Sequence, residues 1–259
     1  GDFKNCPKKN LIKKKKLNIL FNSLGIFKGD NLIIHSNFAG VQQFENNSLK
    51  ISYEFFFSYL IQRLGKNGTL LIPTYNYSFS NGIAFDRKKS PSQVGSFSDY
   101  LIKKRYLNRT NDPIFSHLVF GRLKKEIFKL PVSESLGSKS IFNLIEKKKF
   151  KILCFCCSLK NVTFIHYIEK LALVPYRFNK FFTGIIKKNN NLKKIKIKYF
   201  AGKKNIDYKL KEKKIINLLY KKNLIEYLYG RFNCYLINSH IVKKILLRQL
   251  KKNSLYLIK

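Results

Sequence analysis

Residues 29–36 read Gly-Asp-Asn-Leu-Ile-Ile-His-Ser, and this stretch decides the fold. Its apolar block, Asn31 to His35, is short and begins directly after a glycine and an aspartate, which predicts a buried strand. A helix over residues 17–24 precedes it and ends at Gly25, a position typical of a helix C-cap. The chain therefore enters a sheet early, after one helix.

The next elements repeat this order along the chain. Residues 52–64 carry apolar groups at helical spacing, and residues 68–73 form a second short apolar block. Helices that alternate with buried strands predict an α/β layered fold. Residues 75–98 are rich in serine, asparagine, glycine and proline and lack an apolar period, so they predict a long functional loop.

The remaining sequence continues the α/β pattern. The predicted elements are strands at 114–120 and 150–157, a helix at 164–173 closed by Pro175, short lysine-flanked strands such as 194–200, and helices at 215–228 and 240–250. Residues 1–16 are predicted to form a polar, lysine-rich lead-in. Residues 17–259 then form a single domain, in which the part from about 178 to 259 is rich in lysine.

Composition restricts the class of protein. The chain has 259 residues, of which 45% are hydrophobic and 15% aromatic, enough for a substantial core. No apolar run is long enough to span a bilayer, and the N-terminus is charged rather than signal-like. Three of the five cysteines, Cys154, Cys156 and Cys157, form a C-x-C-C cluster without a second half, which favours neither zinc nor disulfides. We therefore expect a cytoplasmic protein with reduced thiols and no metal.

The formal net charge of +38 is extreme and raises the possibility of a nucleic-acid partner. The sequence, however, has no RNP, KH, zinc-finger or helix-turn-helix signature. Lysine, asparagine and isoleucine are all heavily used, as in a strongly A+T-rich coding sequence, and the lysines are spread along the chain, although they are densest between Lys187 and Lys222. Compositional drift, with some preference for phosphate-bearing ligands, is favoured over nucleic-acid binding.

His166 is the main candidate for a catalytic base. It lies three residues before Glu169 in a predicted helix, so both side chains share one face and the carboxylate can orient the imidazole. Thr163 stands where it can cap the helix, which places His166 in the first turn, near the positive end of the helix dipole. That environment favours the neutral imidazole that a base requires. On spacing alone, a solvated surface pair is the more ordinary interpretation.

Other polar residues lie at predicted strand ends and loops. His35 and Ser36 end the first strand, where ligand-binding loops emerge in α/β sheets, although a buried histidine is the equal alternative. Ser90, Ser92 and Gly95 lie in the long loop, which is also consistent with an ordinary turn.

Arg109 is a candidate for binding phosphate, together with Thr110 and Ser116. A solvated loop edge is the alternative for these three residues. The sequence contains no P-loop, dinucleotide fingerprint or G-x-S-x-G elbow.

Several short segments follow one another in a distinctive order. They are Leu24-Gly-Ile-Phe-Lys-Gly-Asp30, Leu32-Ile-Ile-His-Ser36, Gly68-Thr-Leu-Leu-Ile-Pro-Thr74, Phe85-Asp86, Ser90-Pro-Ser-Gln-Val-Gly95, Arg109-Thr-Asn-Asp-Pro113, Phe115-Ser116, Thr163-Phe-Ile-His166, Glu169 and Val174-Pro-Tyr-Arg177. Their order and approximate spacing, across roughly residues 17 to 180, resemble the aminoglycoside 3-N-acetyltransferase family.

The resemblance implies a three-layer α/β/α sandwich with a mixed sheet, a fold distinct from that of the GNAT acetyltransferases. It also implies acetyl-CoA as the donor and direct attack by an amine of the acceptor. Carried over residue by residue, it makes His166 the general base and Glu169 its companion.

The remaining candidate residues receive weaker roles. The resemblance places His35 and Ser36 in the acyl-pantetheine site and Ser90, Ser92 and Gly95 in a CoA-facing loop; Arg109 completes the cofactor-binding candidates, and Thr74, Ser116 and Thr163 are candidates for binding the substrate or an oxyanion. The chain departs from the family at Asp112-Pro-Ile-Phe-Ser116, where the family often has His-Pro-x-His-Ser, and His117 lies one position beyond that serine.

Charge bears on the acceptor. Aminoglycosides are polycations, whereas this chain has 52 basic and 14 acidic residues, so its field opposes a cationic ligand and attracts an anionic one. The run from Thr163 to Arg177 also resembles family members of cell-surface sugar pathways. We therefore predict a nucleotide-linked amino sugar as the acceptor. An aminoglycoside acceptor, a basic nucleic-acid-binding protein and an inactive family member are the alternatives, and the sequence leaves monomer and dimer both open.

Overall fold

The computed structural model describes residues 8–44, 48–188 and 191–259. At its centre, strand β1 (Asn31–Ser36) pairs in parallel with β2 (Thr69–Pro73) on one side and with β6 (Lys151–Phe155) on the other. Each of these strands is a short apolar block with little solvent exposure, as parallel strands covered on both faces must be. Because the three strands run in the same direction, their carboxyl ends meet at one edge of the sheet.

Antiparallel strands extend the sheet at both sides. They are β5 (His117–Gly121) and β4 (Asn108–Arg109) beyond β2, and β10 (Phe232–Asn238) and β9 (Ile225–Tyr229) beyond β6. Within the described residues the sheet thus has seven strands in the order β4-β5-β2-β1-β6-β10-β9. The sheet is mixed, as expected.

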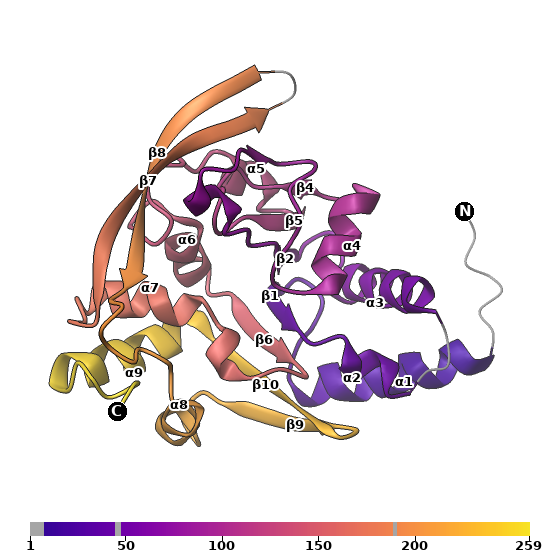
Figure 1. Cartoon of the computed structure of the whole chain (residues 1–259). Helices are drawn as coiled ribbons and strands as arrows, with labels where there is room; N and C mark the ends of the chain where they lie inside the picture. The colour runs from indigo at the N-terminus through magenta and orange to yellow at the C-terminus, as the bar shows by residue number, and fades with distance from the viewer. Residues whose placement is uncertain (1–7, 45–47, 189–190) are drawn as a thin grey trace.

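Helices cover both faces of this sheet (Figure 1). One layer contains α1 (Lys8–Ser23), α2 (Ala39–Gln42), α3 (Leu49–Leu64) and α4 (Ser96–Lys104); the other contains α5 (Lys124–Phe128), α6 (Ile141–Lys147), α7 (Phe164–Leu171), α8 (Glu212–Leu219) and α9 (Ser239–Lys252). Side chains alternate across a strand, so Leu32 and Ile34 pack under the first layer and Ile33 under the second. This arrangement confirms the three-layer α/β/α sandwich.

A second, smaller sheet lies beside the main body. It consists of β3 (Phe85–Asp86), β7 (Arg177–Lys188) and β8 (Asn191–Gly202), in that order. β3 belongs to the long loop and pairs in parallel with β7, whereas β7 and β8 form an antiparallel hairpin. Figure 1 shows this hairpin running along the edge of the molecule, with its distal end projecting beyond the body.

Three predicted elements differ from the structure, and one strand was not predicted. Helix α1 begins at Lys8, inside the segment 1–16 that was predicted as a polar lead-in, and residues 1–7 lie outside the described residues. The predicted helix at 215–228 is divided between α8 and the strand β9, and the strand β10 was not predicted. The lysine-flanked strands are 12 residues each rather than short. In the described part of the chain, no helix is both long and apolar enough to cross a membrane.

Candidate active site

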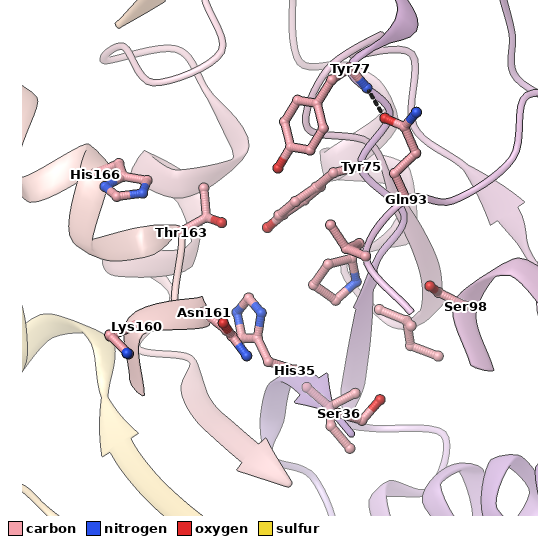
Figure 2. A pocket seen from close by; sticks show the side chains of 14 residues that line it. His35, Ser36, Tyr75, Tyr77, Gln93, Ser98, Lys160, Asn161, Thr163 and His166 are labelled. Carbon is pink, nitrogen blue, oxygen red and sulfur yellow. Dashed lines mark hydrogen bonds between the residues drawn. The ribbon is translucent and has the colours of Figure 1, made fainter. Parts of the chain in front are cut away.

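The carboxyl ends of the three parallel strands open into a cleft of about 400 Å³ (Figure 2). Its lining comes from the end of β1, from the segment after β2, from the tip of the long loop, and from the segment that joins β6 to α7. The polar residues among them are His35, Ser36, Tyr75, Tyr77, Gln93, Ser98, Lys160, Asn161, Thr163 and His166. This is the edge where α/β sheets ordinarily bind their ligands.

His166 reaches this cleft from the first turn of α7, and Glu169 lies directly behind it. The imidazole Nδ1 is 2.7 Å from Glu169 Oε2, as the spacing of three residues predicted. The His166 side chain is 23% exposed, whereas that of Glu169 is fully buried. Within this pair, His166 is therefore accessible to a ligand, whereas Glu169 is buried in the core.

The Glu169 carboxylate has two further partners. The Tyr176 hydroxyl donates a hydrogen bond of 2.8 Å to Oε1, and Arg177 Nε lies 2.7 Å from Oε2. Burial alone would raise the pKa of Glu169, but the neighbouring His166 imidazole, the Arg177 guanidinium and the Tyr176 hydroxyl more than offset this effect, so that its pKa is lowered. The group is thus held as a carboxylate inside the protein.

This arrangement determines what the imidazole can do. An Nδ1–H that donates to Glu169 fixes the ring orientation and leaves the lone pair on Nε2, the nitrogen on the opposite side of the ring. A base held by a third group in this way is the common pattern of enzymes that activate a nucleophile. Arg177 Nη2 also lies 3.0 Å from Nδ1, so Arg177 contacts both members of the pair.

Thr163 does not cap α7. Its backbone is already helical, with φ −60° and ψ −21°, and its hydroxyl makes no capping hydrogen bond. The side chain lies instead at the cleft wall, where Figure 2 shows it facing Tyr75. The prediction of a cap was therefore wrong, although His166 does lie in the first helical turn.

His35 and Ser36 lie at the floor of the cleft. The alternation along β1 turns His35 to the same side as Ile33, which is the side covered by α7. Burial lowers the pKa of His35 to about 4, so the ring is neutral at ordinary pH. Its Nε2 has no hydrogen-bond partner among the described residues. His35 is therefore both a buried strand-end histidine and a residue of the cleft.

A second cavity of about 420 Å³ adjoins the first. Ser36 and Asn161 line both cavities. The second is also lined by Gly95, at the start of α4, and by Cys157, in the segment after β6. Together the two cavities form a groove across the carboxyl edge of the sheet. Ser36 and Asn161 lie where the two cavities meet.

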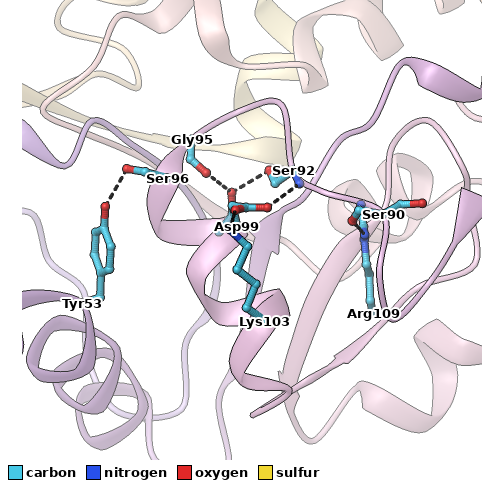
Figure 3. A network of polar contacts seen from close by, with 9 residues as sticks. Tyr53, Ser90, Ser92, Gly95, Ser96, Asp99, Lys103 and Arg109 are labelled. Carbon is cyan, nitrogen blue, oxygen red and sulfur yellow. Dashed lines mark hydrogen bonds and ion pairs between the residues drawn. The ribbon is translucent and has the colours of Figure 1, made fainter. Parts of the chain in front are cut away.

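The serines of the long loop mainly hold the loop together (Figure 3). Ser92 Oγ is 2.8 Å from Ser98 Oγ, and the Ser92 backbone N–H donates to Asp99. Ser90 Oγ accepts from the backbone N–H of Asp86 at 2.8 Å. Between Ser90 and Gly95, the residues that line the two cavities are Gln93, Val94 and Gly95 instead. Gly95 has φ +140°, a backbone conformation that favours glycine.

Arg109 lies outside the cleft, in contrast to its predicted role with phosphate. Its side chain is buried, and Nε contacts Thr74 Oγ1 at 3.0 Å and Ser116 Oγ at 2.9 Å, while the other nitrogens donate to the backbone carbonyls of Thr74 and Ser90. Thr74 and Ser116 are fully buried in the same cluster, so they do not face a substrate either. The cluster ties the end of β2 to the long loop.

Replacing Arg109 by methionine is expected to lower the free energy of unfolding by about 2 to 3 kcal/mol, because it leaves buried carbonyl and hydroxyl groups without donors. Urea denaturation measures this change. Arg122→Met, at an exposed position, is the matched control and is expected to have little effect. Equal stability of the two variants would contradict the structural role of Arg109.

Sequence reasoning missed several residues of the cleft. Tyr75 and Tyr77 follow directly on a buried strand, and this position was the available signal. Lys160 and Asn161 lie in a short 3₁₀ turn before α7, and nothing in their spacing singled them out. Arg177 belonged to a segment that carried the family resemblance. Its contact with Glu169, however, depends on the path of the chain between the end of α7 and the start of β7.

The fold and the cleft together define a class of protein. A histidine faces a polar cleft at the carboxyl edge of a mixed sheet, with a buried carboxylate behind it, and enzymes that activate a nucleophile commonly contain such a pair. A family model described as aminoglycoside 3-N-acetyltransferase matches residues 33–248. This match spans most of the chain. The chain belongs to the aminoglycoside 3-N-acetyltransferase family and is thus an N-acetyltransferase, as the resemblance implied.

Solved structures share the fold at low sequence identity. The apoenzyme of aminoglycoside acetyltransferase AAC(3)-IVa is 22% identical, with a TM-score of 0.75, over 95% of this chain and 91% of that one. AAC-IIIb in its binary complex with CoASH is 18% identical, with a TM-score of 0.78, over 92% and 96%. The YokD protein from Bacillus subtilis is 15% identical, with a TM-score of 0.77, over 96% of both chains. A search of curated proteins gives no match.

Proposed function

We propose that this chain transfers the acetyl group of acetyl-CoA to an amine of an anionic amino sugar, with His166 as the general base. The observation that carries this proposal is the His166–Glu169 pair at 2.7 Å, open to the cleft at one end and buried at the other. Family membership supports the reaction class, and the complex of AAC-IIIb with CoASH supports the donor.

The proposed mechanism is direct transfer. His166 Nε2 takes a proton from the ammonium of the acceptor, directly or through a water, and Glu169 stabilises the resulting imidazolium. The freed amine then attacks the thioester carbonyl. As the C–S bond breaks, the His166 imidazolium returns a proton to the CoA thiolate, so that CoA leaves as a thiol, and the nitrogen releases its second proton to solvent to give the amide. Ser36, which lines both cavities, is the proposed donor that stabilises the oxyanion of the intermediate. No covalent intermediate on the enzyme is required.

The lining of the groove supports an anionic acceptor. Among the described residues, no aspartate or glutamate lines either cavity, and Lys160 lines the one that contains His166. The carboxylate behind His166, that of Glu169, is buried and already paired with Arg177. A polycationic aminoglycoside therefore meets no matching charge here, whereas a phosphate of a nucleotide-linked sugar meets a lysine. An aminoglycoside acceptor remains the second candidate, because the family model carries that description.

The release of free thiol from acetyl-CoA, measured with a panel of nucleotide amino sugars and aminoglycosides, tests the acceptor. We expect turnover with a nucleotide amino sugar, and kcat/KM lower by about 10-fold or more with aminoglycosides, since one lost charge contact of this kind contributes about 1.5 to 3 kcal/mol.

The Lys160→Glu variant sharpens this test. It is expected to lower kcat/KM for the anionic acceptor, whereas Lys222→Glu, which makes the same change in net charge at an exposed position between α8 and β9, is expected to leave it unchanged. Efficient acetylation of aminoglycosides without any turnover of nucleotide amino sugars would overturn the proposed acceptor.

A further inference from the structure

The distal half of the β7–β8 hairpin carries an unusual surface. The register of the hairpin places alternate residues of the two strands on one side. We define the outer hairpin face by the residues Phe181, Ile185 and Lys187 of β7 and Leu192, Lys194 and Lys196 of β8. This face thus mixes apolar with basic side chains, and Thr183 and Lys198 lie on the same side.

The opposite face of the hairpin is packed against the body. Ile197 is fully buried and Ile186 nearly so, and both belong to the core cluster under the second helical layer. Gly184 lies so close to the Phe79 ring that a Cβ atom there would stand 2.6 Å from it. These contacts fix the hairpin and turn the outer hairpin face away from the core.

The apolar residues of the outer hairpin face are open to solvent. Leu192 is 66% exposed, Phe181 55% and Ile185 40%. Lys196 Nζ lies 4.7 Å from the centre of the Phe181 ring, and this contact keeps one lysine among the apolar groups. Exposed apolar groups gathered on one projecting element commonly mark an interaction site.

The charge of the hairpin has one sign. Residues 177–202 include no aspartate or glutamate. Lys198, which pairs across the strands with Phe181, has its charge matched by Glu134 of the body at 3.0 Å. The lysines further out along the hairpin have no such acidic neighbour within their own two strands. The outer hairpin face therefore complements an anionic partner.

We propose that the outer hairpin face docks on an anionic lipid surface. Leu192, Ile185 and Phe181 would enter the boundary between headgroups and acyl chains, and the lysines would lie against the lipid phosphates. An aliphatic pair such as Ile185 and Leu192 has no partner on a nucleic-acid backbone, which binds cations and stacks its bases on aromatic rings. A second copy of the chain is disfavoured because two faces of the same charge repel.

Binding to lipid requires neither His166 nor an acceptor, so it is independent of the proposed reaction. The test is flotation of the full-length chain with vesicles of phosphatidylcholine, with and without phosphatidylglycerol. Binding is expected only to the anionic vesicles, and Lys194→Gln together with Lys196→Gln is expected to weaken it about 30-fold. Leu192→Ser together with Ile185→Ser is expected to weaken it by about 10-fold or more, with all lysines retained.

The control removes the same charge elsewhere. Lys222→Gln with Lys252→Gln, at exposed positions after α8 and at the end of α9, is expected to leave vesicle binding unchanged. An equal loss in this control would show that net charge alone attracts the vesicles and would overturn the proposal. Binding of the unmodified chain to single-stranded RNA but not to vesicles, or self-association through the hairpin without lipid, would also overturn it. Because the exchanged side chains are exposed, circular dichroism is expected to show unchanged folding.

Discussion

Replacing His166 by alanine is expected to reduce kcat by about 10² to 10⁴-fold, the usual contribution of a general base. The acceptor amine is an ammonium ion near neutral pH, and the variant lacks the imidazole that we propose as the acceptor of its proton. The dissociation constant for CoA is expected to remain unchanged. Thiol release from acetyl-CoA and equilibrium binding of CoA measure the two quantities separately.

His240→Ala serves as the matched control, because His240 lies on α9 and lines neither cavity. It is expected to retain full activity. A His166→Ala enzyme as active as this control would remove His166 from the mechanism. A variant that had lost CoA binding along with turnover would point to a role in the binding of CoA rather than in proton transfer.

Replacing Glu169 by alanine is expected to lower the free energy of unfolding by about 3 to 5 kcal/mol, as the loss of one partner of a buried ion pair usually does. The Arg177 side chain is 5% exposed and would remain charged without its carboxylate, and the Tyr176 hydroxyl would lose its acceptor. Glu169→Gln keeps the shape and is expected to be milder, in stability and in kcat. Urea denaturation at neutral pH measures the stability, and thiol release measures the activity.

A surface pair provides the comparison for Glu169. Glu146 forms an ion pair with Lys243 at 3.2 Å and is 19% exposed, so Glu146→Ala is expected to cost no more than about 1 kcal/mol. Similar losses for Glu146→Ala and Glu169→Ala would contradict the assignment of a buried, paired carboxylate.

The pH dependence gives a second readout for Glu169. Its pKa is lowered in the folded protein, so its ionised form stabilises the fold fully above the ordinary carboxyl value of about 4.3 and loses this effect as the pH falls through the folded value. The difference in stability between the unmodified chain and Glu169→Gln is therefore expected to shrink in acid. A difference that widened as the pH fell would require a raised pKa instead.

Local sequence patterns were sufficient for several elements of this structure. The apolar blocks that became β1 and β2, and the helical spacing of α3, were predicted because each depends on neighbours within a few residues. The contact between His166 and Glu169 was predictable for the same reason, since residues three apart on a helix share a face. The place of His35 at a strand end likewise followed from the length of one apolar block.

Tertiary structure decided what these residues face. Arg109 was expected to bind phosphate. Instead it donates hydrogen bonds to Thr74, which lies 35 residues before it, because β4 and β5 join the sheet beyond β2. Residues 225–229 became the strand β9 rather than a helix because β10 supplies their hydrogen-bond partners. A side chain's solvent exposure and its partners depend on which segment, distant in the sequence, lies against it. The periodicity of a single sequence does not say which distant segments come into contact.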